Sequence, residues 1–376
     1  GIVLFIVGIL LLIRPFTSDW FMRSWLEVNL KNIEFNLNQI ENLTQKKAIP
    51  VIKANAYGLG SIEVAKYLSK KNFKLFAVAN LQEALEIKNS GLDNKIFIMG
   101  NNDKDDLKLA IENGFSITIS SWDDIKNLEK LKTSKEVLIH IKIDTGMGRI
   151  GFGSEDSYGV IKYINENKLG TIQGIYSHLS SADENEDEFT LEQINLFKKH
   201  EENKDIPFKH ILNSPGIFKY SKYTNSNYVR PGISMYGILL FDTPLKKLLK
   251  PVFKLKTKVI YIKTLSNNAF ISYGKTAEGK KGDIIATLPI GYADGLDRRF
   301  SNGGTVKIHG EKYTIIGRIC MDMTMIIIPN NLKNKVGIGT EVEIYGEDIN
   351  EQAQSIGSIA DELMTRINKR VSRRYV

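Results

Sequence analysis

From Trp25 onward, short apolar runs alternate with amphipathic stretches of helical period, such as SIEVAKYLSK and NLQEALEIKNSG. Near-continuous apolar strands that alternate with helices predict a parallel sheet covered by helices. The apolar runs are residues 49–53, 75–80, 95–100, 116–120, 137–144, 171–178, 209–213 and 228–238. Eight such units in about 200 residues predict a closed (β/α)8 barrel of the TIM type. A doubly wound open sheet is the alternative.

The pattern changes near Pro251. Strand-like runs separated by Gly, Asn and Asp turns follow, and helical periodicity returns only at residues 355–367. This half of the pattern predicts a mostly antiparallel β domain. We therefore expect a hydrophobic segment and linker over 1–21, a barrel over 22–248 and a β domain over 249–376. The first strand of the barrel part is an alternative member of the β domain.

Residues 2–13 (IVLFIVGILLLI) contain no charged side chain, and Arg14 follows them. This run is shorter than the roughly 20 residues that span a bilayer. Three interpretations compete: the end of a transmembrane helix, a signal-like segment and a buried helix. We favour the first, because no cleavage pattern of small residues follows. It would tether a cytoplasmic catalytic part to a membrane.

Composition narrows the class of protein. Hydrophobic residues make up 42% of the 376 residues and charged residues 25%, which is ordinary for a globular chain with a sizeable core. The net charge is +8, but basic and acidic residues are interleaved, which favours a basic surface with some attraction for anionic ligands over nucleic-acid binding. The single cysteine, Cys320, excludes an internal disulfide and is expected to be a small buried residue. No zinc-ligand spacing occurs, so no metal is predicted.

Function in such a barrel lies at the carboxyl ends of the strands. Lys53 closes the first predicted strand. A lysine there is costly to bury as a cation and well placed to lose its proton and attack an aldehyde. Taken alone, Lys53 is better explained as a lysine that simply emerges at a strand end.

Other predicted strands end in complementary groups. Arg149 follows the fifth strand and could bind a carboxylate with both guanidinium nitrogens. His178 ends the sixth strand and by itself could be a core histidine. Residues 213–216 and 230–233 end the seventh and eighth strands, where glycines, a serine and backbone N–H groups predict a phosphate site. An amine, a phosphate site and two arginines suit a phosphorylated aldehyde cofactor that acts on an amino acid.

These motifs closely resemble the alanine racemases, and VIKANAYGLG resembles their cofactor-binding signature. The resemblance extends from Met22 to Val376 and includes KIDTGMGRIGF, YSHLSSADE, NSPGIF, VRPGISMYGI, ISYGKTAEG, LPIGYADGLDR and GRICMDMT in the family's order. It implies a homodimeric isomerase that uses pyridoxal 5′-phosphate. Its reaction would interconvert L- and D-alanine by two-base transfer of the α-proton and supply D-alanine for peptidoglycan.

The resemblance also implies a role for each matching residue. Lys53 would bear the cofactor and serve as base on one face of the substrate, and Tyr273 would be the second base in the other subunit's site. Arg149 would position the substrate, and Lys142, carbamylated in many members, would orient Arg149. The remaining matches are Arg230 at the pyridine nitrogen, Tyr57, Ser214, Gly232 and Ile233 at the phosphate, His178 beside the cofactor, and Met321 and Tyr292 at the substrate and its access passage.

Two departures from the family pattern leave the substrate open. Residues 1–21 are extra, as in the membrane-bound serine/alanine racemases of vancomycin-resistance clusters. Lys369 or Asn368 stands where many alanine racemases have a tyrosine before the ArgVal pair. A serine racemase is therefore the nearest alternative. A non-catalytic cofactor-binding protein of the same barrel type, or a decarboxylase of the same fold type, ranks lower because the β domain and the racemase motifs are present.

Overall fold

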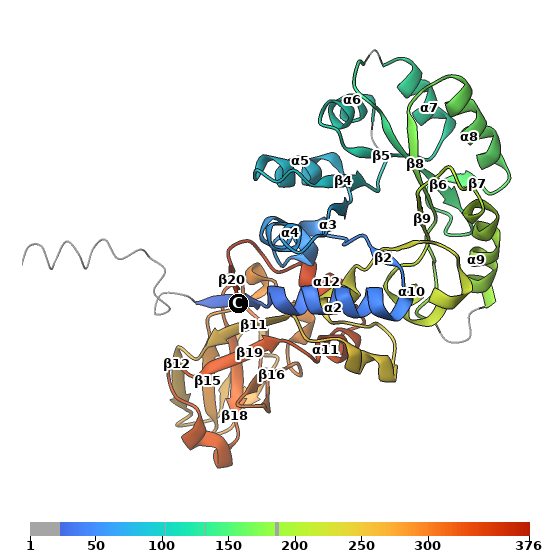
Figure 1. Cartoon of the computed structure of the whole chain (residues 1–376). Coiled ribbons are helices and arrows are strands. Elements are labelled where there is room, and N and C mark those ends of the chain that lie inside the picture. The colour runs from blue at the N-terminus through green and yellow to red at the C-terminus, as the bar shows by residue number, and fades with distance from the viewer. Residues whose placement is uncertain (1–22, 102, 132, 185–187) are drawn as a thin grey trace, which may run out of the picture. The chain divides into compact units, whose positions relative to one another are not determined.

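The computed structural model describes residues 23–101, 103–131, 133–184 and 188–376 (Figure 1). The described chain forms two compact units, Asn29–Val252 and a second that combines Phe253–Val376 with residues 23–28. The hydrophobic segment 2–13 lies outside the described residues. None of the described helices has the length and apolar character needed to cross a membrane.

The unit Asn29–Val252 is the expected (β/α)8 barrel-like fold. Its parallel strands are β2 (Lys47–Ala48), β3 (Leu75–Val78), β4 (Lys95–Ile98), β5 (Ser116–Ile119), β6 (Leu138–Asp144), β8 (Thr171–Tyr176), β9 (Phe208–His210) and β10 (Tyr228–Val229). Strand β2 pairs with β10, and a bridge from Val51 to Ala77 links the segment after β2 to β3. These two connections join the first strand to both of its neighbours. The short strand β7 (Phe152–Gly153) pairs with β6.

Helices cover the outer side of these strands, as Figure 1 shows for α6 to α9. The helices of this unit are α2 (Leu30–Thr44), α4 (Ser61–Ser69), α5 (Leu81–Asn89), α6 (Lys104–Glu112), α7 (Trp122–Glu129), α8 (Asp156–Glu166), α9 (Glu188–Glu201) and α10 (Ser214–Tyr220), and the short segment α3 (Lys53–Tyr57) contains residues with left-handed angles. Polar caps determine several of their starts. Asn80 accepts a hydrogen bond from a backbone N–H at the start of α5, and Ser121 forms a reciprocal capping box with Asp124 in α7.

Two of the predicted strands are much shorter than the apolar runs suggested. The run 49–53 pairs through separate backbone hydrogen bonds to Val229, Pro231 and Ala77 and a bridge at Val51, and Lys53 begins α3 instead of ending a strand. The run 228–238 has two strand residues and then a 3-10 helix, η2 (Ile233–Tyr236). Pro50 and Pro231 each remove one N–H donor, so the ladder is incomplete at both places, although the carbonyls of both prolines still accept hydrogen bonds from neighbouring strands.

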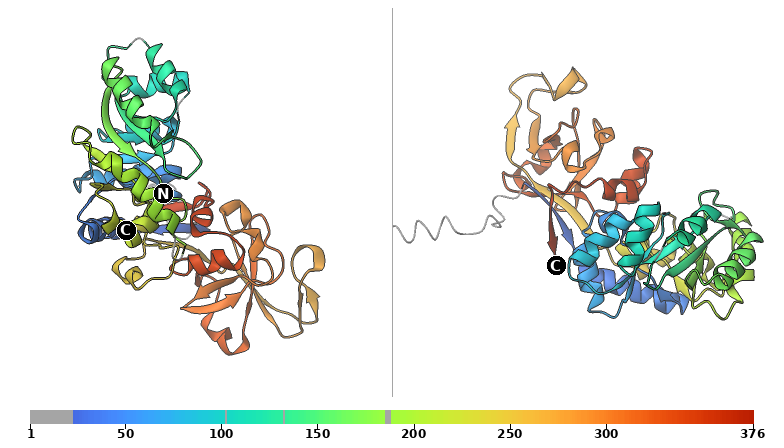
Figure 2. Two further views of the ribbon diagram at one scale, coloured as in Figure 1. Left: turned by 90° about the vertical axis from the view of Figure 1, so that its right-hand side faces the viewer. Right: turned by 90° about the horizontal axis from the view of Figure 1, so that it is seen from above.

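The second unit is mostly antiparallel, as expected. Its largest sheet has the order β17-β16-β19-β11-β1-β20, in which only β1 and β20 run parallel; Figure 2 shows dark-red β20 beside blue β1. A second sheet has the order β12-β15-β18, and β13 pairs with β14. The strands are β1 (Ser24–Val28), β11 (Phe253–Lys258), β12 (Tyr261–Thr264), β13 (Ala269–Phe270), β14 (Glu278–Gly279), β15 (Ile284–Leu288), β16 (Thr305–Ile308), β17 (Glu311–Thr314), β18 (Thr324–Ile328), β19 (Glu341–Tyr345) and β20 (Ser372–Tyr375). Helices α11 (Ile349–Ser355) and α12 (Ala360–Thr365) follow β19, so helix begins slightly earlier than the pattern predicted.

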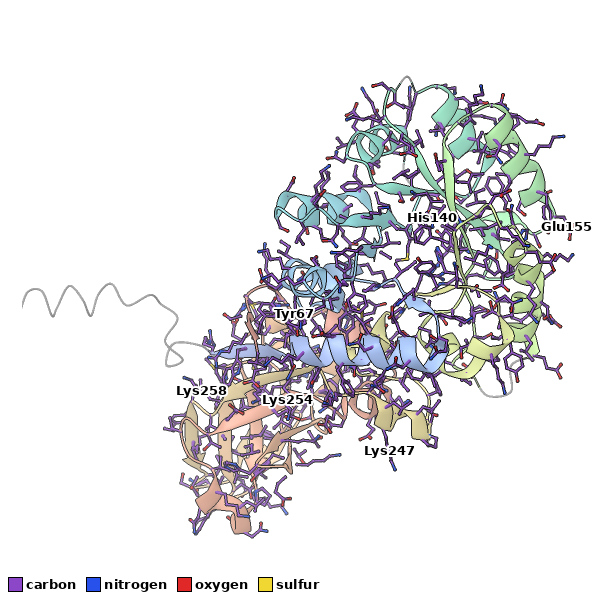
Figure 3. All side chains as sticks on the ribbon, in the orientation of Figure 1. Tyr67, His140, Glu155, Lys247, Lys254 and Lys258 are labelled. Carbon is purple, nitrogen blue, oxygen red and sulfur yellow. The ribbon has the colours of Figure 1, made fainter. Side chains whose placement is uncertain are left out.

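The interior of the barrel is not wholly apolar. Fully buried aromatic and aliphatic side chains such as Phe97 fill most of it. Buried groups that can carry a charge lie on the strands or next to them, among them His140, Lys142, His210 and Arg230 (Figure 3 labels His140). Groups of this kind are rarely buried without a partner or a function. Their surroundings therefore define the candidate site.

Candidate functional site

Lys53 begins a turn of unusual backbone geometry. The next four residues all have positive φ angles: Ala54 50°, Asn55 55°, Ala56 52° and Tyr57 54°. None of them is glycine, so each left-handed conformation costs about 1–2 kcal/mol. Such a run persists only where its surroundings hold it, and strain of this kind is concentrated at functional sites. No glycine signals this turn before Gly58, which is why sequence patterns did not predict it.

Specific hydrogen bonds hold this left-handed turn in place. The two oxygens of Glu83 accept from the backbone N–H groups of Ala54 (2.7 Å) and Ala79 (2.8 Å). The side chain of Asn55 accepts from the backbone N–H of Ser61 at 2.9 Å. Glu83 thus ties the turn to α5 and Asn55 ties it to α4, and the turn fixes where the half-buried Lys53 and the buried Tyr57 leave the main chain.

Ser214 and Gly232 lie together beside the hydroxyl of Tyr57. The Oγ atom of Ser214 accepts from the backbone N–H groups of Gly232 and Ser234, both at 3.1 Å. A Cβ atom on Gly232 would lie 2.4 Å from the Tyr57 hydroxyl oxygen, so only glycine leaves that space open. Ile233 follows directly as the first residue of η2. Hydroxyls and backbone N–H groups that meet at an open space suit an anion such as a phosphate.

Arg230 is 3% exposed and makes an extensive set of hydrogen bonds. Its Nη1 atom donates to Nδ1 of His210 (2.6 Å) and to the His210 carbonyl (2.8 Å). Its Nη2 atom donates to the carbonyls of Ser177 (2.7 Å) and Ile211 (3.2 Å) and lies 3.3 Å from Nδ1 of His178. No carboxylate among the described residues pairs with this guanidinium. Burial lowers the pKa of Arg230 to about 10, so it is a cation at neutral pH.

Lys142 is a second buried cationic group, 1% exposed. Its Nζ atom donates to the carbonyl of Ile143 at 2.8 Å and lies 5.4 Å from the centre of the Tyr176 ring. Burial and then the charge of Arg230 lower the pKa of Lys142 to about 7, although Asp144 opposes the shift. A large fraction of this amine is therefore uncharged near neutral pH.

The half-buried His178 lies within the field of all these cations. Desolvation is the largest cause that holds the pKa of His178 well below its usual value. The charges of Arg230, Arg149, Lys142 and Lys53 add to it in that order. His178 is therefore neutral, and these four side chains come together around it.

Arg149 lies near His178 on a loop whose conformation requires glycine residues. The carboxylate of Asp144 accepts from the backbone N–H of Gly146 at 2.9 Å and of Gly148 at 3.1 Å. Gly151 has a φ of 129°, and a Cβ atom there would lie 2.6 Å from the Asp144 nitrogen. The loop leaves Arg149 exposed, so its guanidinium is available to a ligand.

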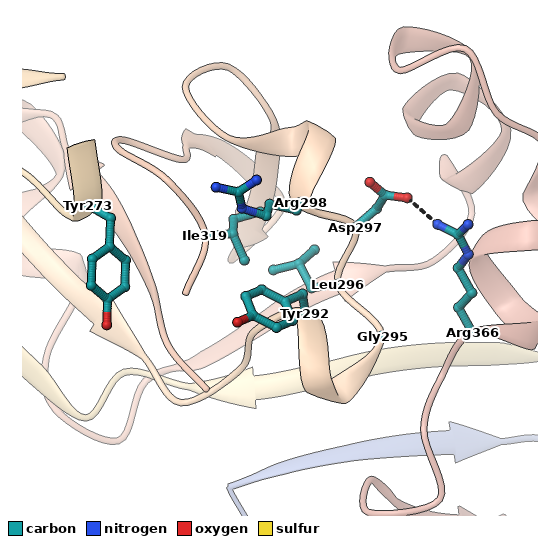
Figure 4. Close-up of a pocket in the computed structure, with 8 residues that line it drawn as sticks. All are labelled: Tyr273, Tyr292, Gly295, Leu296, Asp297, Arg298, Ile319 and Arg366. Atoms are coloured by element: carbon teal, nitrogen blue, oxygen red, sulfur yellow. Dashed lines mark hydrogen bonds and ion pairs between the residues drawn. The ribbon is translucent and has the colours of Figure 1, made fainter. Parts of the chain in front are cut away.

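The other predicted residues lie in the β unit. Tyr273 and Tyr292 line a pocket of about 690 Å³, and Figure 4 shows the hydroxyl of Tyr292 pointing to the side on which Tyr273 lies. Tyr273 is 67% exposed and Met321 is 52% exposed. The other residues that line the pocket are Gly295, Leu296, Asp297, Arg298, Ile319 and Arg366. Cys320 is half-buried instead of buried as expected, with its sulfur 3.4 Å from the hydroxyl of Ser272.

Arg370 connects the two segments that present Tyr292 and Met321. The backbone N–H of Tyr292 donates to the Cys320 carbonyl at 3.1 Å, which places the segments side by side. Arg370 then bonds one carboxylate of each segment, Asp294 at 2.8 Å and Asp322 at 2.6 Å. Arg370 was not among the site residues predicted from the sequence. Two features of the sequence could have indicated it: an aspartate in each of the motifs YAD and CMD, and several arginines near the C-terminus that could pair with them.

The structure groups the predicted residues by unit. The barrel brings together Lys53, Tyr57, Lys142, Arg149, His178, Ser214, Arg230, Gly232 and Ile233. Tyr273, Tyr292 and Met321 belong to the β unit. The barrel group offers an amine, several cations and an open anion site. The β unit offers exposed phenol groups.

The fold defines a class of protein, a (β/α)8 barrel-like unit followed by a mostly antiparallel β unit. The family model for the alanine racemase N-terminal domain matches residues 28–239, and the model for the C-terminal domain matches residues 252–375. The chain belongs to the alanine racemase family.

Individual relatives match this chain along nearly their whole length. The alanine racemase of Fusobacterium nucleatum subsp. nucleatum is 41% identical over 358 residues, covering 94% of this chain and 99% of the relative. That of Methanococcus maripaludis is 38% identical, with coverage of 94% and 98%. Among solved structures, the alanine racemase of Clostridium difficile 630 has a TM-score of 0.86 at 35% identity, covering 94% of this chain and 96% of the other.

Replacement of Arg370 by Gln should loosen the segments that present Tyr292 and Met321. The substitution removes both ion pairs, so we expect the backbone amides of Tyr292 and Ala293 to exchange with solvent roughly fivefold faster. Hydrogen exchange followed by mass spectrometry or NMR measures this. Lys369→Gln is the matched control, since it removes a neighbouring charge that forms no ion pair in the described part of the chain. Equal exchange in Arg370→Gln and the unaltered protein would contradict this role.

Proposed function

We propose that this protein is a homodimeric alanine racemase that interconverts L- and D-alanine with pyridoxal 5′-phosphate. Family membership over both units is the observation that supports this most strongly. The barrel alone would also suit a cofactor-binding protein without catalysis. The presence of the β unit and of Tyr273 in the same chain favours the racemase.

The barrel residues fit the cofactor that the family generally uses. Four basic side chains lie around His178, one of them the partly charged Lys142, and the acidic residue that acts on Lys142 is Asp144. The open space beside Gly232 and the hydroxyls of Tyr57 and Ser214 suit the phosphate. We propose that Lys53 holds the cofactor covalently, that Tyr57, Ser214, Gly232 and Ile233 hold its phosphate, and that Arg230 and His178 contact its ring.

The bound cofactor would make the α-proton of alanine acidic, because its ring system delocalises the charge left behind. The protein must then hold a proton acceptor on each face of the substrate. We assign Nζ of Lys53 to one face and the hydroxyl oxygen of the partner subunit's Tyr273 to the other. Each accepts the proton in one direction of the reaction and donates it in the other.

Other residues would bind and orient the substrate. The exposed guanidinium of Arg149 can bind the carboxylate of alanine with two parallel hydrogen bonds. Met321 and Tyr292 would contact the substrate and line its access passage, held by the Arg370 connection described above. Arg230 keeps its proton, so it would leave the pyridine nitrogen unprotonated and thereby limit side reactions such as transamination.

Lys142 has the chemistry required for carbamylation. Its pKa of about 7 makes the neutral amine available at neutral pH. The nitrogen lone pair can attack carbon dioxide, forming an N–C bond and releasing one proton to solvent. The carbamate that results is an anion, and it would compensate part of the buried positive charge next to Arg230 and orient Arg149.

Serine remains the alternative substrate. It rests on the position of Lys369, exposed in a turn before Arg370, where many alanine racemases have tyrosine. A higher kcat/KM for L-serine than for L-alanine would favour the serine alternative. The proposed tether rests on residues 2–13 alone, and a cytoplasmic catalytic part rests on the supply of D-alanine to peptidoglycan precursors.

Lys53→Ala should remove the covalent attachment and one of the two bases. We expect the near-visible absorption band of the bound cofactor to disappear and kcat for L-alanine to fall by roughly 10³-fold or more. Lys47→Ala, at an exposed lysine before the same site, should leave both unchanged. A Lys53→Ala protein with the band and activity intact would contradict the proposed function.

Mixing two inactive variants tests whether Tyr273 acts across the dimer. In a heterodimer of Lys53→Ala and Tyr273→Phe subunits, one site of two would hold both bases if Tyr273 serves the partner. Random reassortment should therefore restore about a quarter of the unaltered activity. Tyr261→Phe, at another exposed tyrosine of the β unit, is the control and should remain active alone. If Tyr273 served its own subunit, no activity would return.

Carbamylation of Lys142 predicts a carbon-13 carbamate signal after incubation with labelled bicarbonate. The signal should be lost in Lys142→Ala and kept in Lys47→Ala. It should weaken as the pH falls below about 7, since protonation removes the lone pair that attacks carbon dioxide. A signal that persists in Lys142→Ala would assign the modification to another lysine.

A further inference from the structure

Two fully buried histidines extend inward from Arg230. His210 lies at the end of β9 and His140 lies in β6, and both have no exposed surface. Nδ1 of His210 is 2.6 Å from Nη1 of Arg230, and Nε2 of His210 is 3.1 Å from Nδ1 of His140. Phe97 stacks on His140 at 4.2 Å, and Tyr176 stacks on His210 at 5.1 Å. Arg230, His210 and His140 therefore form a continuous row of hydrogen bonds, which we call the histidine row.

The direction of each hydrogen bond in this row follows from Arg230. A guanidinium can only donate, so Nδ1 of His210 must accept. A neutral His210 then has its proton on Nε2 and donates it to Nδ1 of His140. His140 must in turn have its proton on Nε2, and that nitrogen is buried without a hydrogen-bond partner in the part of the chain that the structure describes.

We propose that His140 is a positioning residue which, through His210, fixes the guanidinium of Arg230 toward the cofactor ring without neutralising its charge. This inference rests on the proposed cofactor-binding function of the barrel. A carboxylate in the place of His210 would hold Arg230 equally well but would compensate its charge. Two neutral imidazoles orient the guanidinium and leave its full charge directed at the ligand.

The surroundings keep both rings neutral. Burial and the charge of Arg230 lower the pKa of His140 to about 3 and hold the pKa of His210 well below its usual value. The charge of Lys142 acts on His210 in the same direction. Tyr176 is the other titratable group against these rings, and burial raises its pKa to about 12, so it too is neutral.

Gly174 protects the contact between the two histidines. It lies opposite His140 where the register of β6 and β8 shifts. A Cβ atom on Gly174 would lie 2.2 Å from Nδ1 of His140, the atom that accepts from His210. Only glycine is compatible with the row at this position. Gly174→Ala therefore displaces His140 without altering His210, Arg230 or any group that contacts the ligand.

Nitrogen-15 NMR of the histidine-labelled protein tests the row directly. We expect both His140 and His210 in the neutral form with the proton on Nε2 from about pH 6 to about pH 9. The His140→Gln and His140→Leu spectra assign the signals. A proton on Nδ1 of either ring, or titration of either within this range, would overturn the proposal. Because the cofactor-free protein gives the same test, failure of the row is distinguishable from failure to bind the cofactor.

Variants of the cofactor-loaded enzyme test whether His140 positions Arg230 through its hydrogen bond or merely fills space in the core. His140→Leu and Gly174→Ala remove the acceptor for His210, so transamination events per racemisation should rise about 2- to 10-fold, with a shifted absorption maximum of the bound cofactor. His140→Gln, whose amide oxygen can accept the same bond, should restore most of the unaltered behaviour. Ile141→Val, a neighbouring buried substitution, controls for loosened packing. If His140→Leu, His140→Gln and Ile141→Val changed the transamination ratio equally, the proposal would be overturned.

Discussion

The buried guanidinium of Arg230 is the interaction on which the barrel site depends. Burying a cation costs several kcal/mol unless a counter-charge or full hydrogen bonding compensates it. Here carbonyl groups and two histidines satisfy the hydrogen bonds, while no described carboxylate supplies the charge. Arg149, Lys53 and the charged fraction of Lys142 add further positive charge around His178. The barrel thus keeps a surplus of positive charge that an anionic ligand can compensate.

The backbone turn after Lys53 also costs free energy of folding. Four consecutive non-glycine residues adopt left-handed angles, and Glu83 and Asn55 hold them there. Both costs occur at the carboxyl ends of the strands, where barrel proteins place their chemistry. A site that is destabilising without its ligand, but rigidly held, is pre-organised for binding, since little rearrangement is required when the ligand arrives.

Sequence patterns predicted the fold class and most of the strands, because apolar periodicity records burial directly. They predicted longer regular strands near Lys53 and Arg230, where Pro50 and Pro231 each leave one ladder donor missing although neighbouring backbone groups still pair. The run VLIHIKID (137–144) was predicted to be an apolar strand, and nothing in it revealed that His140 would contact His210, 70 residues away. Arg370 was missed for the same reason: its two carboxylate partners are 76 and 48 residues distant, and periodicity does not report such contacts.

Calorimetric measurement of ligand binding to the cofactor-free Lys53→Ala protein tests the surplus of positive charge most directly. Without Lys53 the cofactor cannot form a covalent bond to this position, so only noncovalent binding is measured. Pyridoxal 5′-phosphate and pyridoxal differ only by the phosphate group. Compensation of the buried charge predicts that the phosphate ester binds roughly 100-fold more tightly, and that added salt weakens this preference. Equal affinities for the two compounds would contradict the account.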